Sequence, residues 1–525
     1  PALLTRRANG GFLLAEESHI FAFQVSKIDE LLTADAPLNV DYDVKEQRLS
    51  LSGTPGTSVT LWLEEGRKRV LTLEDEEPIQ VNNLSFAKWQ TATEKLESRA
   101  ASILADKDKQ PIDQADQTST PAPPLAELWK LQGTHYINSV QRYIYNGTPC
   151  LAVADGKFVR IIAADGSEKH VIEVSHTIGA LYWWGKYQLL LVGTRDEKLR
   201  AFDTLGNERW THTAKMASEL IDSQKFYWFK KSFPGVIALK SLALLDGREV
   251  IFVGGAGTVE IIDEKGQLEK RFWQTWGPVD GFTALVKEDA EPRMFCCRSM
   301  GGRPTVFEIS PTKDGGWYQR DMGHTMLLDM AGLNLGSFGF SMVGRNFLSV
   351  EELVPGSEPV LVGDFNGAHN RIMIWNLKGQ PIHEVNPGPG FTSQAINSDY
   401  YGRATERDLN VRGVVVLDLD GNGSLEIAVA MDGGYVLAFD HELQSRFVVK
   451  LKSAPALLTA IERPGQATLL AVADMEGEIR LLNATGETVN KVTIKGKPTV
   501  LYHAGNQLVV GTSRAEITSF TLPNK

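Results

Sequence analysis

Residues 414–439 read VVVLDLDGNGSLEIAVAMDGGYVLAF, and this stretch decides the fold. The short apolar runs "VVVL" and "EIAVAM" are typical of buried strands. The segments "DLDGNGS" and "MDGG" are turn clusters, because Gly, Asn and Asp tolerate the backbone angles of tight turns. The stretch therefore predicts three consecutive antiparallel strands joined by short turns.

The same unit recurs along the chain. Its second strand is the easiest part to recognise, and we find eight copies: CLAVAD from Cys150, LLLVGT from Leu189, VIFVGG from Val250, MFCCRS from Met294, VLVGDF from Val360, IAVAMD from Ile427, LLAVAD from Leu469 and LVVGTS from Leu508. Third strands that end in Asp/Asn-x-x-Gly turns follow most of them. Where nothing is inserted, the units are about 40 residues apart, the length of one propeller blade.

A solitary four-stranded unit cannot bury its own faces, so the array must close into a ring. The last unit ends after its third strand, in "ITSFTLPNK", and an unassigned strand, "AELWKLQ", begins at Ala126. We expect this strand to complete the last blade. The fold class is therefore all-β, with an eight-bladed β-propeller of four-stranded blades over residues 125–525.

Two segments precede the propeller. Residues 1–85 contain "HIFAFQV" and "VTLWL" around the turn cluster "SGTPGTS", which predicts a small, sandwich-like β domain or the tail of a truncated domain. Residues 86–124 begin with a helical apolar pattern and continue as a polar, Pro-rich linker. Because the chain begins with Pro1, we expect it to be a processed chain or part of a larger polypeptide.

Composition narrows the range of partners. The net charge of −11 argues against a nucleic-acid binder, which carries a basic surface. No apolar run is long enough to span a membrane. Three cysteines cannot form a disulfide framework. The adjacent Cys296 and Cys297 are expected to pack as small apolar side chains, and a vicinal disulfide is the alternative.

The units resemble the FG-GAP/VCBS-type and quinoprotein-like (PQQ-like) propeller repeats over residues 126–525. In the unit at 414–439 the oxygen-bearing groups at alternate positions match an integrin-type calcium loop: Asp418, Asp420, Asn422, the Ser424 carbonyl and Glu426. Hard oxygen ligands in a tight glycine-containing loop are what Ca²⁺ requires. The resemblance implies a structural calcium and an extracellular or periplasmic location, and an ion-free turn is the alternative.

The spacing of the second strands indicates where a ligand would bind. Surplus residues fall at about 213–235, 310–345 and 383–410, each between the fourth strand of one blade and the first strand of the next. In a propeller these connections emerge on one face, and long loops on a rigid scaffold tend to carry function. With nearby short loops they supply an aromatic and basic group of candidate ligand-binding residues: Trp228, Lys230, Trp276, Arg320, Asn370, Arg371 and Arg403.

Three functions fit such a surface. The first is a secreted module that binds a polar or anionic glycan, because aromatic rings stack on sugars and Arg or Lys pairs with carboxylate or sulfate. The second is a polysaccharide lyase acting on a uronate-containing glycan, with base candidates in the same loops: His324, His369, Tyr400 and Tyr401. The third is a protein-interaction scaffold. A quinone-dependent dehydrogenase is disfavoured, because the Trp-docking pattern of that family occurs once, in "LGNERW".

Overall fold

The computed structural model describes residues 3–6, 12–16, 19–28, 32–43, 46–63, 67–74, 78–82, 122–215, 235–287, 290–298, 306–321, 348–365, 371–379, 381–385, 411–431, 434–453, 455–463 and 465–523. They form two compact units, one N-terminal and one containing the repeats, which we describe separately. The predicted helix and most of the predicted linker, residues 86–121, lie outside the described residues.

The N-terminal unit is an eight-stranded antiparallel sheet, which confirms the prediction of β structure there. Its strands are β1 (Leu3–Arg6), β2 (Phe12–Glu16), β3 (His19–Ile28), β4 (Leu32–Asp43), β5 (Arg48–Gly53), β6 (Ser58–Trp62), β7 (Lys68–Thr72) and β8 (Ile79–Val81). The predicted turn cluster joins β5 to β6. Alternate residues of these strands, among them Leu38, Leu51 and Leu61, are fully buried in one core, as period-2 strands with one covered face require.

The repeat unit is a β-propeller. Its first sheets are β10 (Ile137–Tyr145), β11 (Thr148–Asp155), β12 (Phe158–Ala163) and β13 (Glu168–Glu173), then β14 (Ile178–Trp184), β15 (Leu189–Thr194), β16 (Lys198–Phe202) and β17 (Glu208–Thr213). A six-stranded sheet follows: β18 (Val236–Ala243), β19 (Glu249–Ile262), β20 (Leu268–Lys287), β21 (Ala290–Arg298), β22 (Val306–Pro311) and β23 (Trp317–Asp321).

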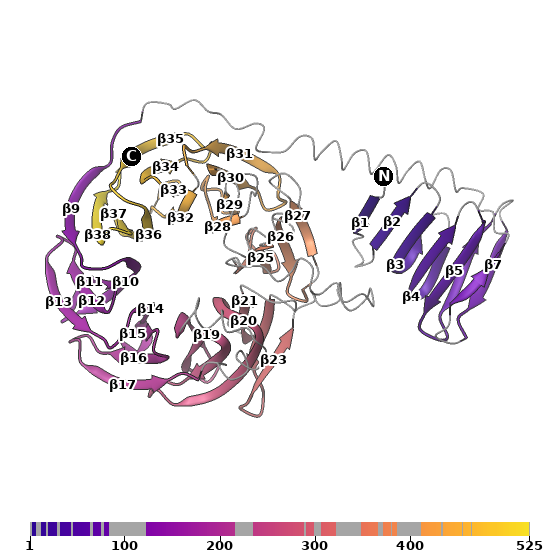
Figure 1. Ribbon diagram of the computed structural model, residues 1–525, viewed down its shortest axis with the longest axis horizontal. Coiled ribbons are helices and arrows are strands. Elements are labelled where there is room, and N and C mark those ends of the chain that lie inside the picture. The colour runs from indigo at the N-terminus through magenta and orange to yellow at the C-terminus, as the bar shows by residue number, and fades with distance from the viewer. Residues whose placement is uncertain are drawn as a thin grey trace. The chain divides into compact units, whose positions relative to one another are not determined.

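Four-stranded sheets complete the ring. They are β24 (Leu348–Glu351), β25 (Val360–Phe365), β26 (Arg371–Asn376) and β27 (Pro381–Val385); β28 (Val411–Leu417), β29 (Glu426–Met431), β30 (Tyr435–Phe439) and β31 (Ser445–Lys450); β32 (Pro455–Ile461), β33 (Leu469–Asp474), β34 (Glu478–Leu482) and β35 (Thr488–Thr493); and β36 (Pro498–Ala504), β37 (Gln507–Thr512), β38 (Glu516–Thr521) and β9 (Ala126–Gln132). In Figure 1 the sheets follow one another around a ring, with first strands such as β10, β14 and β36 inside and fourth strands such as β13, β17 and β35 at the outer wall.

Each of the eight predicted second strands lies in a separate interior strand of these sheets: β11, β15, β19, β21, β25, β29, β33 and β37. The propeller prediction is confirmed, but four-stranded blades are not formed throughout. β19 pairs with β18 through residues 249–255 and with β20 through 256–262, and β20 then continues through 279–287 to pair with β21. The third and fourth predicted units share one sheet, because the connecting segments stay extended.

Ring closure also follows the sequence prediction. β9 pairs antiparallel with β38, from Glu516 opposite Gln132 to Thr521 opposite Ala126. The first strand after the linker is therefore the fourth strand of the last sheet. Chain segments almost 400 residues apart in sequence hold the two ends of the propeller together.

Neighbouring sheets are joined by aromatic rings that dock on glycines. A side chain on Gly166 would collide with the Trp129 ring, whose indole N–H donates to the Ala164 carbonyl at 3.0 Å. Gly166 has φ of +85°, so this turn needs glycine both for its backbone and for the space above it. The same arrangement repeats between other sheets, with His170 on Gly206, Trp210 on Gly266 and Phe447 on Gly486.

Docking of a ring on a glycine is therefore more frequent than the Trp pattern in the sequence indicated, because His and Phe also serve as the docking ring. The cysteine prediction is confirmed, because Cys296 and Cys297 are free thiols, fully buried in β21.

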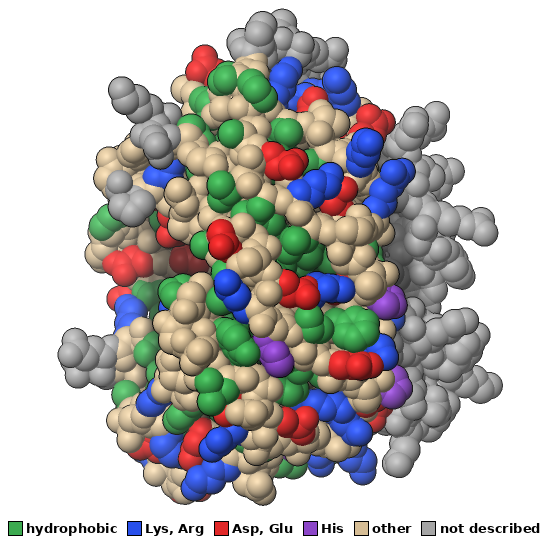
Figure 2. Space-filling view, turned by 90° about the vertical axis from the view of Figure 1, so that its left-hand side faces the viewer, with side chains coloured by type: hydrophobic (Ala, Val, Ile, Leu, Met, Phe, Trp, Pro, Cys, Tyr) green, Lys and Arg blue, Asp and Glu red, His purple; other side chains and the backbone are tan. Residues whose placement is uncertain are grey.

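Figure 2 shows the outer wall that carries β9, β13 and β17, where positive and negative side chains are interspersed and hydrophobic ones are scattered. An exposed ion pair of the first sheet joins Lys157 to Glu173. Such pairs add little stability individually.

Candidate functional site

One face of the propeller carries both the connectors between sheets and the turns between second and third strands. We call it the connector face. A backbone N–H of each short connector donates to such a turn: Gly133 to Ala515, Val174 to Lys157, Leu451 to Gly434 and Ile494 to Gly477, at 2.6–2.9 Å. This repeated bond fixes the connectors to the rim, because a buried backbone donor without an acceptor is costly.

The first long insertion starts and ends on this face. At its start the Ala214 N–H donates to the Glu197 carbonyl at 2.7 Å, and at its end Gly235 lies directly against the Thr194 carbonyl. Residues 322–347 join β23 to β24, and residues 386–410 join β27 to β28. All three insertions are thus connections from a fourth strand to a first strand, as the spacing predicted.

Most candidate ligand-binding and catalytic residues lie outside the described residues: Trp228, Lys230, His324, His369, Asn370, Tyr400, Tyr401 and Arg403. Trp276 and Arg371 lie on β20 and β26, and only their backbone is described. Their proposed roles remain predictions from the sequence.

The predicted position of Arg320 in an insertion was wrong. Arg320 lies on β23, the outer strand of its sheet, and its guanidinium donates to the Glu308 carboxylate at 2.6 Å. Arg293 binds the same carboxylate through two nitrogens, at 2.9 and 2.6 Å. Residues 312–316 form a short turn and not the start of the insertion, so the surplus residues begin after Asp321.

An exposed aromatic ring with two cations lies at the edge of the connector face. Trp273 of β20 is 50% exposed. Trp273 pairs with Thr258 of β19, and Thr213 at the end of β17 pairs with Lys198 of β16 in the same way. Trp273 therefore occupies the position just before a connector. The Lys215 ammonium and the Arg271 guanidinium lie 5.8 and 5.9 Å from the ring centroid.

A buried carboxylate holds this group in place. Glu260 is fully buried and accepts hydrogen bonds from Arg271 Nε at 2.6 Å and from the Lys215 backbone N–H at 2.9 Å, with His212 Nε2 at 2.6 Å. Burial raises the pKa of Glu260, but His212, the Lys215 N–H and Arg271 outweigh burial and lower that pKa. The ionised carboxylate therefore fixes the base of the first insertion beside Trp273.

The predicted calcium loop joins β28 to β29 and is held by its own side chains. The two oxygens of Asp418 accept from the N–H groups of Gly421 and Gly423 at 2.8 and 3.0 Å. Asn422 Oδ1 accepts from the Ser424 N–H at 2.7 Å. Such bonds close the turn and orient oxygen atoms around its centre.

Three acidic groups meet in this loop. Ligand oxygens of Asp418, Asp420 and Glu426 lie within 4.8 Å of one another. Arg446 of β31 binds Asp420 at 2.6 Å and Glu426 at 3.1 Å, a partner that sequence spacing did not reveal. One guanidinium leaves the three carboxylates with excess negative charge. Burial, followed by the charges of Asp420 and Asp418, raises the pKa of Glu426, so a divalent cation fits this donor set.

Comparison with known proteins supports the fold. No family model and no curated protein matches the chain. Among solved structures, the WD40-like protein Sqt1 from Saccharomyces cerevisiae gives a TM-score of 0.55 at 10% identity, and the computationally designed protein Ika8 gives 0.50 at 13%. BamB from Moraxella catarrhalis gives 0.48 at 15%. Each match covers 76% of this chain and all of the other.

At these identities the likeness shows the β-propeller fold alone. The FG-GAP and quinoprotein-like resemblance stays a prediction. A propeller is a scaffold that supports binding in general. Among the residues that the structure describes, no helix has the length and apolar character that a membrane crossing requires.

Proposed function

We propose that this chain is a secreted or periplasmic binding module that recognises a polar or anionic glycan on its connector face. The supporting observation is Trp273, half exposed at the base of the first insertion with Lys215 and Arg271 beside it. An aromatic ring offers a stacking surface for a sugar, and a nearby ammonium offers a charge-assisted bond to a carboxylate or sulfate.

The lining of this surface favours anions over neutral sugars. Arg271 is committed to Glu260, whereas the exposed Lys215 uses only its backbone N–H on that carboxylate. Its ammonium is therefore the cation that a ligand would meet. Because an exposed ion pair is screened by salt, ligand binding should weaken as ionic strength rises.

We expect the protein to bind polygalacturonate more tightly than dextran, and Trp273→Ala to weaken that binding about tenfold or more, the usual loss when a central aromatic contact is removed. Lys215→Gln should reduce the salt dependence. Affinity electrophoresis and calorimetry measure both effects. Tyr318→Ala is the matched control, because Tyr318 is 56% exposed but lies on the outer strand β23.

The same experiment separates the alternatives. Ultraviolet absorbance of unsaturated product would appear if the protein were a lyase, and the loss of that signal in His324, His369, Tyr400 or Tyr401 variants would identify the base. Equal binding by the Trp273 and Tyr318 variants would contradict the glycan site. If none of a panel of uronate and sulfated polymers binds, the protein-interaction scaffold is the remaining function.

We also propose that the loop at 418–426 holds one structural calcium ion. The ligands would be Asp418, Asp420, Asn422, the Ser424 carbonyl and Glu426. The loop joins a first to a second strand, so it lies at the end of the sheet away from the connector face. The ion would stabilise this turn and balance the acidic charge that Arg446 leaves over. It would take no part in ligand binding.

Calcium is expected to raise the melting temperature, since an ion at about a hundred times its Kd stabilises the folded state by about 2.7 kcal/mol. Chelation should reverse the shift, and Asp418→Ala should abolish it. Asp440→Ala is the control, because Asp440 accepts two backbone N–H groups of its turn at 2.9 and 2.8 Å without belonging to the acidic group. Equal melting curves with calcium and with chelator would support the ion-free turn.

A further inference from the structure

A cavity of about 400 Å³ lies between the last sheet and the first, and no function described above uses it. Its wall includes the turn after β36 and the turn after β12, so it opens on the face opposite to the connectors. The side chains that matter most are Arg142, Leu151, Tyr502 and Gln507.

The cavity lies where two positions that hold aromatic rings at the neighbouring interface, between β10 and β14, hold Ala504 and Arg142. The first strands of the sheets carry a register shift near their start, which serves as a common reference for comparing positions. Counted from it, Ala504 of β36 is equivalent to Tyr143 of β10. Arg142 of β10 is equivalent to Trp183 of β14. Between the β10 and β14 sheets, the Tyr143 and Trp183 rings pack edge to face with centroids 5.4 Å apart. Ala504 and Arg142 occupy the equivalent positions here and leave space.

The polar groups of the wall suit an anion. Its described residues include Arg142 and His503 but no Asp or Glu. Tyr502 accepts the Arg142 backbone N–H at 3.0 Å, which leaves its own O–H free to donate. His503 Nε2 donates to the Gly505 carbonyl at 2.7 Å, so a neutral ring offers no second donor and His503 takes no part in the proposed contact.

The other residues of the wall could not bind a second charged group of the ligand. Gln507 is committed at both ends, since it donates to the Ala164 carbonyl at 3.0 Å and accepts from Ser519 at 2.9 Å. Leu151 and Ala504 are apolar. A guanidinium and a phenol at one side of an apolar wall form a binding pattern for a compact carboxylate.

We propose that this cavity binds a small organic anion, a carboxylate on an apolar body, through Arg142 and Tyr502. The volume is near the lower end for ligand sites, about 300–1,000 Å³, so the apolar body is of the size of one ring. The site is independent of the glycan surface and of the calcium loop.

Titration calorimetry on the full-length protein measures occupancy of the cavity. A cysteine label would not report it, because the Cys150 side chain packs with Tyr143 and Trp183 on the face of the first sheet that is turned away from the cavity. Benzoate is the probe, benzamide is its neutral isostere, and inorganic phosphate is the anion without an apolar body.

Benzoate is expected to bind the full-length protein with a saturable heat signal, and benzamide and phosphate to bind much more weakly. Arg142→Gln should weaken benzoate binding about tenfold or more, because a charge-assisted bond is lost. Arg195→Gln, which replaces an exposed arginine on the connector face, is the control and should leave benzoate binding unchanged. Equal binding of benzamide, or unchanged benzoate binding by Arg142→Gln, would overturn the proposal.

A second variant tests whether benzoate needs the empty volume of the cavity. Ala504→Phe places a ring where β10 has Tyr143, and it should abolish benzoate binding while keeping or raising the melting temperature, because it fills a void. If this variant lowers the melting temperature, Arg142→Gln still decides the question, since it changes charge with little change in packing. Absence of saturable binding by the unmodified protein at millimolar benzoate would refute the site.

Discussion

Replacing β9 (Ala126–Gln132) by a seven-residue Gly-Ser linker is expected to abolish the cooperative folding of the propeller. The same treatment of β35 (Thr488–Thr493) is expected to leave the propeller folded with a lower melting temperature. Each change removes the fourth strand of a four-stranded sheet, and the two strands are of comparable length. Only β9 joins the last sheet to the chain that enters the first.

The two strands also differ in what they bury. Trp129 of β9 is 8% exposed, docks on Gly166 and donates to the Ala164 carbonyl in the first sheet. Loss of a buried Trp costs about 3–5 kcal/mol, against a total stability of about 5–15 kcal/mol for a domain. No residue of β35 is fully buried. Removal of β9 therefore takes away both ring closure and a docking ring.

Far- and near-ultraviolet circular dichroism during heating, with gel filtration at 25 °C, distinguishes the outcomes. The β9 replacement should lose the sharp near-ultraviolet transition and elute as expanded or aggregated material, and the β35 replacement should keep both. A β9 replacement that melts as sharply and as late as the β35 replacement would show that the ring closes without its outer strand.

Strand identity and ring closure could be predicted from the sequence because they depend on local patterns that repeat. All eight second strands, from Cys150 to Leu508, were placed in interior strands by their apolar runs, and β9 was assigned to the last sheet because one unit lacked a fourth strand. Repetition compensates for weak individual signals. A pattern that would be ambiguous once becomes decisive when it recurs at one spacing.

Features set by contact between sheets could not be predicted. Arg320 was placed in a loop because the residues before it form a Gly-rich turn, and only the pairing of β22 with β23 shows that the strand continues to Asp321. The docking rings were missed since Trp, His and Phe serve equally well once a glycine faces them. Arg446 and the Ala504–Arg142 cavity depend on residues that are distant in sequence. The exposure of Trp273 likewise depends on packing that periodicity does not report.

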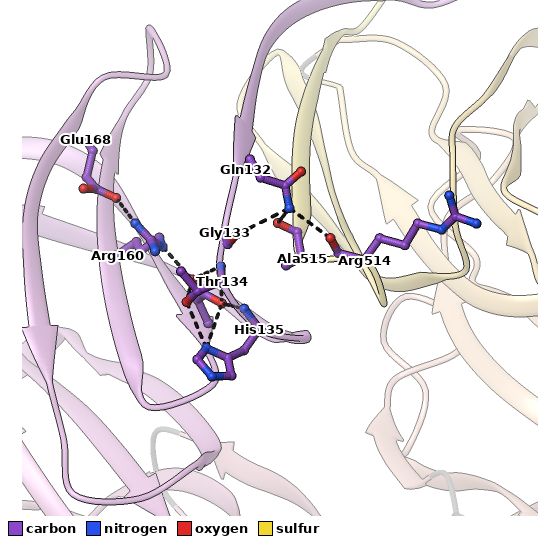
Figure 3. A network of polar contacts seen from close by, with 9 residues as sticks. Gln132, Gly133, Thr134, His135, Arg160, Glu168, Arg514 and Ala515 are labelled. Atoms are coloured by element: carbon purple, nitrogen blue, oxygen red, sulfur yellow. Dashed lines mark hydrogen bonds and ion pairs between the residues drawn. The ribbon is translucent and has the colours of Figure 1, made fainter.

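Asp155→Ala is expected to lower the free energy of unfolding by about 3–5 kcal/mol, the cost of removing one partner from a buried charge pair. Asp155 is fully buried at the end of β11 and accepts from the backbone N–H groups of Thr134 at 2.9 Å and His135 at 2.5 Å, from Thr134 Oγ1 at 3.0 Å and from Arg160 Nε at 2.7 Å. Figure 3 shows this network where the chain passes from the last sheet to the first, beside the bonds from Gln132 to Arg514 and Ala515.

The variant leaves two backbone donors and part of the Arg160 guanidinium without their acceptor, although Arg160 keeps Glu168 at 2.6 Å. Asp155→Asn preserves shape without charge and should cost less, about 1–3 kcal/mol. Asp246→Ala is the control, because Asp246 pairs with Arg248 at an exposed position and surface pairs contribute at most about 1 kcal/mol. Urea unfolding followed by tryptophan fluorescence measures all three variants.

The pH dependence of this loss identifies the carboxylate as its source. Burial raises the pKa of Asp155, but the Arg160 guanidinium and the Thr134 and His135 donors outweigh burial and hold it below the ordinary value of 3.8. A depressed folded-state pKa contributes stability that is complete above the unfolded value and is lost as the pH falls through the folded value. The difference in unfolding free energy between the unmodified protein and Asp155→Ala should therefore be constant near neutrality and shrink below pH 3.8. A difference that stays constant down to acid unfolding would assign the loss to packing, and a neutral-pH loss below about 1 kcal/mol would show that the connector holds without this anchor.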